Sequence, residues 1–259
     1  MIFPVVLITG ASSGIGRALA IACARPGVTL HLGGRDAARL AETEAACRAR
    51  GAEVHTRVFD VTDAAGMADW IAAAGRLDLV VANAGISGGT GRAQAETAAQ
   101  TRAIFAVNVD GMLNTVLPAI EAMRAQAPDA SGVRGRIAVI TSIAAFIATP
   151  GAPAYCAAKA AADHWTVATA ANLRRDGILL TSVCPGFIRT PMTAGNPYRM
   201  PGLMDADCAA AIILRGVAAG RRRVVFPWWM GLLARVIGQL PPRMVAGLAT
   251  RAPGKPPLR

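Results

Sequence analysis

Short apolar runs rich in Val, Ile and Leu alternate along this 259-residue chain with longer Ala-rich segments of helical pattern. This alternation is typical of βαβ units, in which helices bury parallel strands on both faces. It predicts strands over residues 4–9, 28–33, 53–59, 77–83, 136–142, 178–184 and 223–226. Helices are expected between them, for example over 37–50, 64–74 and 154–175. We therefore expect an α/β fold with a doubly wound parallel seven-stranded sheet and helices on both faces.

A glycine-rich turn joins the first predicted strand to the helix that follows it, with the sequence Thr9-Gly10-Ala11-Ser12-Ser13-Gly14-Ile15-Gly16. Backbone N–H groups and a helix N-terminus at such a turn favour a bound pyrophosphate. The spacing G-x-x-x-G-x-G differs from the G-x-G-x-x-G fingerprint, so a purely structural need for glycine stays open for the turn alone. The predicted contacts of a dinucleotide here are Gly10, Ser12, Ser13, Gly14, Ile15 and Gly16.

The end of the second predicted strand indicates which dinucleotide the chain binds. An acidic residue there binds the ribose 2′-hydroxyl of NAD, whereas an arginine accommodates the 2′-phosphate of NADP. Gly34 stands where the acid is expected, and Arg35 follows it. Asp36 is interpreted as the N-cap of the helix that begins near Ala37. The sequence therefore predicts NADP(H) rather than NAD(H) as the cofactor, with Arg35 as a phosphate contact.

Tyr155 and Lys159 stand four residues apart, so they share one face of a predicted helix. The chain has only two tyrosines and two lysines, while 25 of its 27 basic residues are arginine. A compact ammonium can sit beside a phenol and lower its pKa, whereas the broader guanidinium fork of arginine is less suited to that position. The pair is predicted to carry acid–base chemistry.

With these motifs in chain order, residues 4 to about 191 resemble the classical short-chain dehydrogenase/reductase family. Further matches are Asp60-Val61, Asn83-Ala84-Gly85, Ser142 and Pro185-Gly186, which follow the third, fourth, fifth and sixth predicted strands, and Asn108 in the run Asn-Val-Asp-Gly. Several of these motifs are weak singly, but their common order and placement on the predicted sheet are specific.

The resemblance implies an oxidoreductase that transfers a hydride between NADP(H) and a carbonyl or secondary alcohol. Tyr155 would exchange a proton with the substrate oxygen, and Ser142 would hydrogen-bond the same oxygen. Lys159 would lower the pKa of Tyr155 and hold the nicotinamide ribose, and Asn108 would anchor a water that relays protons. The remaining implied cofactor contacts are Asp60, Val61, Asn83, Ala84, Gly85, Pro185, Gly186, Ile188 and Thr190. The three histidines, His31, His55 and His164, lack ligand spacing, and no metal site is predicted.

One domain fits this length, with residues 1–220 as the dinucleotide-binding catalytic part and 221–259 as a C-terminal extension. Residues 187–207 are rich in Met and Pro and predict a mobile apolar lid. Such a lid favours a hydrophobic substrate of lipid-, oxoacyl- or steroid-like character. Residues 252–259 are expected to be a frayed end.

The extension is basic and apolar. Of the net charge of +11, nine positive charges lie from Cys208 onward, where no Asp or Glu occurs. After Pro227, Trp229, Leu232, Leu233, Val236, Ile237 and Leu240 share one face of a predicted amphipathic helix, with Arg235 and Gln239 opposite. Two interpretations stay open: the helix packs on a neighbouring subunit or the active site, or it makes a peripheral membrane contact. The family resemblance also favours a homo-oligomer.

Other function classes are less consistent with the sequence. An NADP(H)-binding protein without turnover, such as a sensor or structural subunit, would not need the set Asn108, Ser142, Tyr155 and Lys159. No motif that reads nucleic acid accompanies the arginines, so no nucleic-acid partner is expected. Five scattered cysteines and the lack of an export-signal pattern favour the cytoplasm. No run reaches the roughly 20 uninterrupted apolar residues of a spanning helix, so no transmembrane anchor is expected.

Overall fold

The computed structural model describes residues 3–91, 95–249 and 255–258. Its main sheet has seven strands, all parallel, in the order β3-β2-β1-β4-β5-β6-β9. The strands are β1 (Val5–Thr9), β2 (Thr29–Gly34), β3 (Glu53–Val58), β4 (Leu79–Ala82), β5 (Gly135–Ile140), β6 (Ile178–Pro185) and β9 (Arg223–Phe226). Every predicted strand is present, which confirms the α/β fold with a doubly wound sheet.

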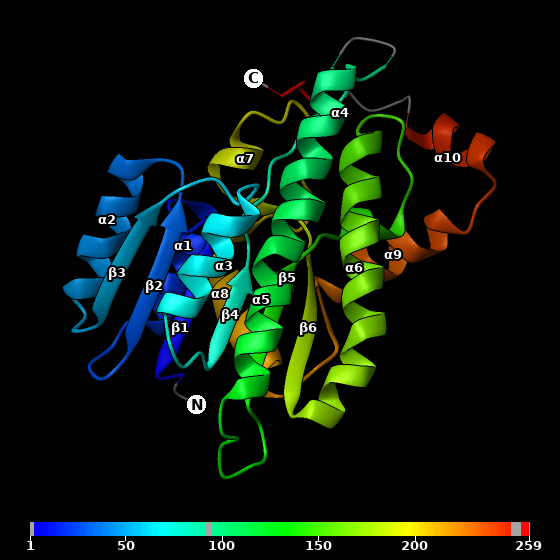
Figure 1. The fold of residues 1–259 in the computed structure, drawn as a ribbon. Helices are drawn as coiled ribbons and strands as arrows, with labels where there is room; N and C mark the ends of the chain where they lie inside the picture. Colours follow the sequence, from blue (N-terminus) through cyan, green and yellow to red (C-terminus); the bar gives the residue numbers. More distant parts are fainter. Residues whose placement is uncertain (1–2, 92–94, 250–254, 259) are drawn as a thin grey trace.

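Helices cover both faces of the sheet (Figure 1). One face carries α1 (Gly14–Cys23), α2 (Ala37–Arg48) and α8 (Ala206–Ala218), and the other carries α3 (Ala64–Ala73), α5 (Gly111–Ala125) and α6 (Pro153–Leu173). A separate apolar core fills each of the two layers. The chain order reverses between β1 and β4, and a crevice is expected where the carboxyl ends of those strands diverge.

One continuous helix is long and apolar enough to cross a membrane by length and composition, Ala98–Ala125. It consists of α4 (Ala98–Phe105), the π-helical turn η1 (Ala106–Asp110) and α5. Polar residues such as Arg102 and Asn108 interrupt the apolar residues of this helix, so the sequence alone predicts no spanning segment here. Half of its most apolar window is buried, and α5 packs on α3, β4 and β5. These contacts are those of a helix in the core of the domain.

The stretch 187–207, predicted as a lid, is more regular than expected. It contains β7 (Ile188–Arg189), α7 (Pro191–Ala194) and β8 (Met204–Asp205), and β7 pairs with β8 in a parallel two-stranded sheet. Arg189 Nε donates to Asp205 Oδ1 across that pair at 2.9 Å. The Ile188 side chain is buried in the core between α8 and the main sheet. Both ends of the lid are therefore anchored to the body of the protein.

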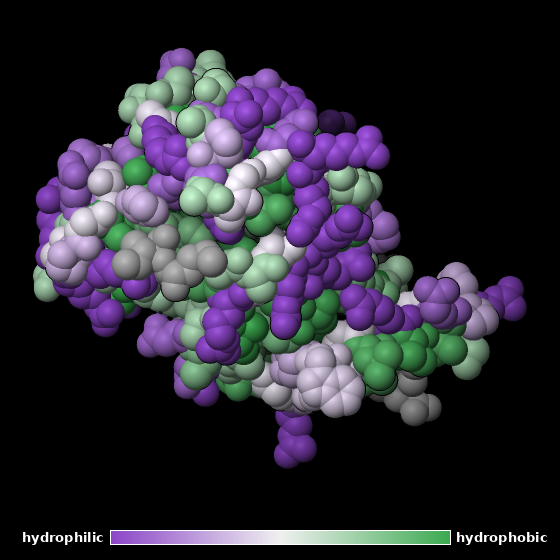
Figure 2. Space-filling model, turned by 90° about the horizontal axis from the view of Figure 1, so that it is seen from below, coloured by the Kyte–Doolittle hydropathy of each residue, from purple (hydrophilic) through white to green (hydrophobic). Residues whose placement is uncertain are grey.

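The C-terminal extension contributes β9 to the edge of the sheet and continues into α9 (Trp228–Gly238) and α10 (Pro242–Ala249). Small residues form the inner face of α9, because a Cβ at Gly231 would lie 2.2 Å from Val225 and one at Gly238 would lie 2.0 Å from the Phe146 carbonyl oxygen. The outer face carries the apolar residues of the predicted stripe, and Leu232 is 54% exposed. Figure 2 shows apolar side chains gathered on the lobe that these helices form at the right of the view.

The expectation of a frayed end is wrong for residues 255–258. These residues return to the top of the molecule, near α4, and hydrogen-bond to residues 89–100 (Figure 1). The rest of the predicted frayed stretch, 252–254 and 259, lies outside the described residues.

Candidate active site

A cleft of about 310 Å³ opens at the carboxyl ends of the central strands. Most of the residues that the sequence singled out line it: Gly10, Ser12, Ser13, Gly14, Ile15, Arg35, Asp60, Val61, Asn83, Ala84, Gly85, Ser142, Tyr155, Lys159, Pro185, Gly186, Ile188 and Thr190. Two predicted residues, Gly16 and Asn108, do not line the cleft. Gly16 packs against Gly10, and Asn108 hydrogen-bonds to Ile86; Gly10 and Ile86 both line the cleft.

The glycine-rich turn forms the floor of the cleft. Gly10 has φ +67°, and a Cβ there would lie 2.9 Å from the Cα of Ala84. A Cβ at Gly16 would lie 2.3 Å from the Gly10 carbonyl oxygen, so Gly16 lets the first turn of α1 pack directly on the turn. Asn83 Nδ2 donates to the carbonyl oxygens of Thr9 at 3.0 Å and Gly10 at 3.1 Å. The N-terminus of α1 consequently faces the cleft, a geometry that fits a pyrophosphate.

Two arginines stand at one end of the cleft, Arg35 and Arg39. Asp36 is the N-cap of α2 and accepts from the Arg39 backbone N at 3.0 Å, as the sequence predicted. Its carboxylate also pairs with Arg39 Nε at 2.6 Å. Gly34 contributes no side chain and faces Ser12. Arg39, which no sequence motif indicates, lies three residues after the N-cap and lines the cleft with Arg35.

Asp60 lies beside this arginine pair. Its Oδ1 accepts from the Thr62 backbone N at 3.0 Å and the Thr62 hydroxyl at 2.9 Å, and its Oδ2 lies 3.5 Å from Arg35 Nη1. Partial burial raises the pKa of Asp60, but the Thr62 hydrogen bonds and the Arg35 guanidinium outweigh it and hold the pKa below its usual value. Asp60 is therefore an ionised acceptor at the rim of the cleft.

Tyr155 and Lys159 project from the first two turns of α6, as their spacing predicted. The Lys159 ammonium is buried and donates to the Ile140 carbonyl oxygen at 2.8 Å, and it lies 5.9 Å from the centroid of the Tyr155 ring. Burial lowers the pKa of Lys159 to about 8. Burial also raises the pKa of Tyr155 to about 12, against the opposite effect of a hydrogen bond with Ser142. The cleft thus holds a protonated phenol beside a buried cation.

Ser142 begins the 3-10 turn η2 (Ile143–Phe146) directly after β5. Its hydroxyl oxygen accepts from the Ala144 backbone N at 3.1 Å, so it caps this turn, and it also hydrogen-bonds Tyr155. The cap fixes the position of the hydroxyl at the cleft wall. Ser142 therefore serves the local fold and is placed for chemistry as well.

Asn108 lies in η1, where the helix widens by one π-helical turn, a feature frequent at functional sites. Its Oδ1 accepts from the Ile86 backbone N and its Nδ2 donates to the Ile86 carbonyl oxygen, both at 2.9 Å. The side chain thereby holds the loop after β4 in place, and Gly85 of that loop lines the cleft. The predicted role of Asn108 in a water relay remains a prediction.

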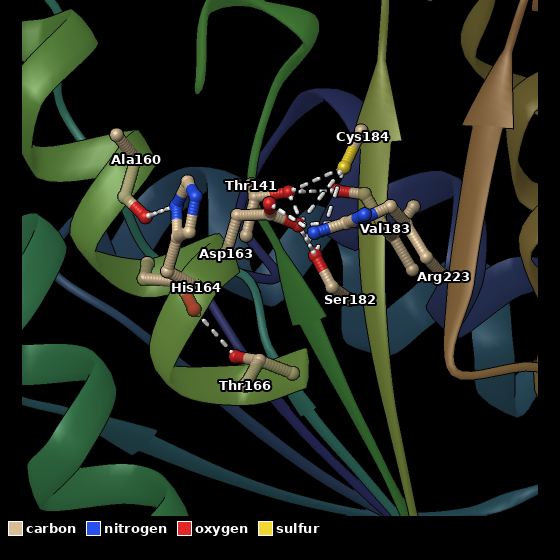
Figure 3. Close-up of polar contacts among 10 residues, drawn as sticks. Thr141, Ala160, Asp163, His164, Thr166, Ser182, Val183, Cys184 and Arg223 are labelled. Carbon is tan, nitrogen blue, oxygen red and sulfur yellow. Dashed lines mark hydrogen bonds and ion pairs between the residues drawn. The ribbon is translucent and has the colours of Figure 1, made fainter. Parts of the chain in front are cut away.

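A buried polar cluster fixes α6 against the sheet (Figure 3). Asp163 is fully buried, accepts from the Ser182 hydroxyl of β6 at 2.6 Å, and takes two hydrogen bonds from Arg223 of β9, at 3.0 Å from Nε and 2.7 Å from Nη2. This bidentate pair sets the position of the helix that carries Tyr155 and Lys159. The neighbouring His164 faces away from the cluster and contacts the Ala160 carbonyl oxygen at 2.9 Å.

Comparison with known proteins agrees with this arrangement. The short chain dehydrogenase family matches residues 4–199. An uncharacterized oxidoreductase from Myxococcus xanthus is 34% identical over 258 residues, which cover 97% of this chain and 98% of that protein. The structure of a short-chain dehydrogenase from Sphingobium yanoikuyae in complex with NADPH matches with a TM-score of 0.78 at 27% identity, covering 92% of this chain and 97% of that one.

Levodione reductase also has a similar structure, with a TM-score of 0.78 at 27% identity over 88% of this chain and 97% of that chain. The matched family spans the glycine-rich turn, Ser142, Tyr155 and Lys159 within one continuous stretch of the chain. The chain belongs to the short-chain dehydrogenase/reductase family of oxidoreductases, which use NAD or NADP to interconvert carbonyls and alcohols.

Proposed function

We propose that the protein is an NADP(H)-dependent oxidoreductase acting on the carbonyl or secondary alcohol of a hydrophobic small molecule. The observation that carries this proposal is the division of one cleft into two ends. Arg35 and Arg39 stand at one end, and Ser142, Tyr155 and Lys159 stand at the other. The glycine-rich turn between them fits the pyrophosphate of a dinucleotide.

The preference for NADP(H) follows from the charges at the arginine end. A 2′-phosphate would meet two guanidinium groups, which bind phosphate by charge-assisted hydrogen bonds. Asp36 is the acidic residue closest in sequence to that end, and its carboxylate is engaged by the N-terminus of α2 and by Arg39. No carboxylate stands at position 34, where NAD-binding chains hold the ribose hydroxyls. The NADPH complex of the Sphingobium relative is consistent with this assignment.

The chemistry of the catalytic end follows from the states of its groups. The bound nicotinamide supplies or accepts the hydride. Tyr155, protonated at neutral pH, gives its proton to the substrate oxygen during reduction and takes it back during oxidation. The Ser142 hydroxyl donates to the same oxygen and stabilises the charge that develops there. The Lys159 ammonium stabilises the phenolate that Tyr155 becomes after giving up its proton.

The substrate end of the cleft favours an apolar molecule. Met192, of the stretch 187–207, lines the cleft and is exposed. Phe187 and Tyr198 of the same stretch contact each other with ring centroids 6.1 Å apart. Their side chains offer apolar surface to an acyl chain or a fused ring system more readily than to a polyol.

A screen of NADPH consumption tests this proposal. Ketones and oxoacyl compounds of increasing chain length are supplied to the purified protein, and the fall in NADPH absorbance is followed. We expect turnover that rises with the apolar surface of the substrate and that exceeds turnover with NADH. Tight NADPH binding without consumption by any carbonyl, or of NADP⁺ by the matching alcohols, would instead indicate a cofactor-binding protein without turnover.

We propose a cytoplasmic location at a membrane surface for this activity, and the exposed apolar face of α9 and α10 supports the contact with the membrane. Trp228, Leu232, Leu233, Val236 and Met244 are exposed there, with Trp228 at 72%. Arg221 and Arg222 precede this face and are exposed as well. Tryptophan beside arginine suits the headgroup region of an anionic membrane. A second copy of the chain, covering the same face in a homo-oligomer, is the alternative that the experiment on this face must separate.

A further inference from the structure

Both lysines of the chain lie against the ring of Tyr155. Lys159 Nζ is 5.9 Å from the ring centroid, and Lys255 Nζ is 5.1 Å from it. The other 25 basic residues are arginines. The family's chemistry uses Lys159, whereas Lys255 comes from the far end of the chain and has no part in the mechanism described above. A second ammonium beside the phenol therefore calls for an explanation of its own.

The segment that carries Lys255 is built into the site by its backbone. Gly89 N donates to the Pro256 carbonyl oxygen at 2.9 Å, and Gly91 N donates to that of Lys255 at 2.8 Å. Leu258 N donates to Gln100 Oε1 at 2.6 Å. We call residues 255–258 the terminal strap.

Glycines at positions 88 and 89, in the loop after β4, allow the terminal strap to pack this closely. A Cβ at Gly89 would lie 2.6 Å from the Lys255 carbonyl oxygen and 2.4 Å from that of Gly151. A Cβ at Gly88 would lie 2.9 Å from the backbone N of Leu258. Side chains at these two positions would push the strap away, so the sequence of the loop is matched to the presence of the strap.

The Lys255 ammonium is held by a neutral hydroxyl group, and none of the carboxylates in the described part of the chain pairs with it. Its Nζ donates to the Ser87 hydroxyl oxygen at 2.5 Å. Among residues 3–91, 95–249 and 255–258, no carboxylate lies within 4.0 Å of Lys255. Glu96, a carboxylate of the same region, instead accepts from the Ala154 backbone N at the start of α6. A half-buried ammonium whose partner among the described residues is a neutral hydroxyl, with no carboxylate beside it, can still bind an anion.

We propose that Lys255 binds an anionic group of the substrate, so that the enzyme prefers an oxo acid, or the matching hydroxy acid, to neutral carbonyl compounds. This inference rests on the proposed function and names the substrate class more closely. Because Lys255 Nζ lies 5.1 Å from the centroid of the ring whose hydroxyl protonates the carbonyl oxygen, we place the carboxylate of the acid near the reacting carbonyl, as in a 3-oxo acid. The rest of the molecule is the apolar chain that the stretch 187–207 accommodates.

In the reductive direction, the carbonyl carbon of a 3-oxo acid takes a hydride from NADPH and its oxygen takes a proton from Tyr155. The products are a 3-hydroxy acid and NADP⁺, and the carboxylate is unchanged. Lys255 touches the substrate without exchanging a proton with it, so it is a specificity-determining residue. Burial lowers the pKa of Lys255 to about 8, which leaves the group charged at neutral pH.

Matched substrates and variants test this inference. 3-Oxooctanoate and its methyl ester differ in one charge at constant chain length, and each is reduced with NADPH by the wild type, Lys255→Met and Arg243→Met. Arg243 is an exposed arginine of α10, so Arg243→Met is a control that removes one positive charge from the extension at a different position. We expect kcat/KM for the acid to fall roughly 10- to 100-fold in Lys255→Met, the range of a lost charged hydrogen bond, with the ester changed less than about 3-fold. The Arg243→Met enzyme should keep the wild-type preference for the acid.

An equal loss for acid and ester in Lys255→Met would overturn the inference, because Lys255 would then only hold the strap in place. A wild-type enzyme that reduces the ester as well as the acid would overturn it too, while leaving the proposed function intact.

A second measurement separates the inference about Lys255 from the proposed function. Octanoate, which cannot be reduced, is titrated into the NADPH-bound protein by calorimetry. Binding that Lys255→Met weakens and Arg243→Met leaves unchanged supports the anion site even if no carbonyl is turned over, and binding equal in all three proteins refutes it.

Discussion

At the scale of single residues, the site combines side chains that a sequence motif can reveal with others that only the folded chain brings together. Tyr155, Lys159 and Arg35 could be predicted, because a fixed spacing on a helix or the end of a strand determines where they lie. Arg39 and Lys255 could not, since their places depend on the N-cap of α2 and on a segment that reaches the site from 96 residues beyond Lys159. Because proline and glycine surround Lys255 in the sequence, the composition of this segment predicts a frayed end.

Arg35 provides a test of cofactor choice at this scale. Arg35→Ala should weaken NADPH binding roughly 10- to 100-fold, at the lower end because this side chain is 62% exposed, and should leave NADH binding nearly unchanged. Fluorescence titration with each cofactor measures both affinities. Arg48→Ala, at the last residue of α2 and outside the cleft, should change neither. Equal losses for NADPH and NADH in Arg35→Ala would assign Arg35 a structural role.

The two lysines predict a pH dependence. The pKa of Lys159 is lowered to about 8, so its ammonium is charged below that pH and becomes neutral above it. Tyr155, with a pKa of about 12, keeps its proton throughout. The kcat for reduction of a neutral ketone should therefore fall as the pH rises through about 8, because the phenolate loses the cation that stabilises it.

Lys255 has a similarly lowered pKa, so a variant must separate the two groups. Lys255→Met should show the same fall in kcat for a neutral ketone, since Lys159 is still present. Stopped-flow measurements of the hydride-transfer rate between about pH 6 and 9 resolve the effect. A rate that stays level across this interval, or a fall that disappears in Lys255→Met, would remove Lys159 from the pH-dependent step.

At the scale of elements, the strands were the most predictable part of the molecule. Parallel strands covered on both faces are mostly apolar, so runs such as Val5–Thr9 and Leu79–Ala82 stand out from the helices between them. The two-residue strands β7 and β8 have no such pattern and are defined by their pairing with each other. The inward side of α9 was also not predictable, because it depends on the small residues that fit against β9 and η2.

The attachment of α6 gives a prediction for stability. Arg223→Met leaves the buried Asp163 carboxylate with Ser182 and Cys184 as its remaining partners among the described residues. Breaking a buried pair costs about 3–5 kcal/mol of unfolding free energy, and the 30% exposure of the arginine side chain reduces this to roughly 2–3 kcal/mol. Urea unfolding measures the change. Arg222→Met, the exposed neighbour, should change stability by less than about 0.5 kcal/mol, and a similar value for Arg223→Met would show that the pair does not fix α6.

At the scale of the whole molecule, the two apolar cores and the cleft form a single catalytic body, and α9 and α10 project from it. The extension therefore divides into parts with different tasks. β9 completes the sheet, the apolar lobe stays exposed, and the terminal strap returns to the active site. A boundary at residue 220 is consistent with a change in composition, but it cuts the sheet between β6 and β9, which hydrogen-bond along Ser182–Pro185.

Vesicle flotation tests whether the apolar lobe formed by α9 and α10 binds a membrane. The protein should float with vesicles of phosphatidylcholine and phosphatidylserine at low salt, and the bound fraction should fall as salt rises. Leu232→Glu places a charge on the lobe and should abolish flotation, whereas Leu117→Glu, at an apolar residue of α5 that is 49% exposed, should float as the wild type does. Protein that stays in the soluble fraction, together with a dimer in sedimentation that Leu232→Glu dissociates, would instead identify the lobe as an interface between two copies.

The central claim, a reductase that uses Tyr155 as its acid on a dinucleotide held by the glycine-rich turn, is tested most directly by Tyr155→Phe. Turnover of a carbonyl found in the NADPH screen and the affinity for NADPH are measured on the same preparation. Phenylalanine keeps the ring and lacks the hydroxyl group that donates the proton. The kcat should therefore fall by at least about 100-fold, which is the lower end of the rate enhancement that general acid catalysis typically provides. NADPH affinity should change less than about 3-fold, because the variant keeps every cofactor contact other than the hydroxyl. Comparable kcat in wild type and Tyr155→Phe would contradict the account.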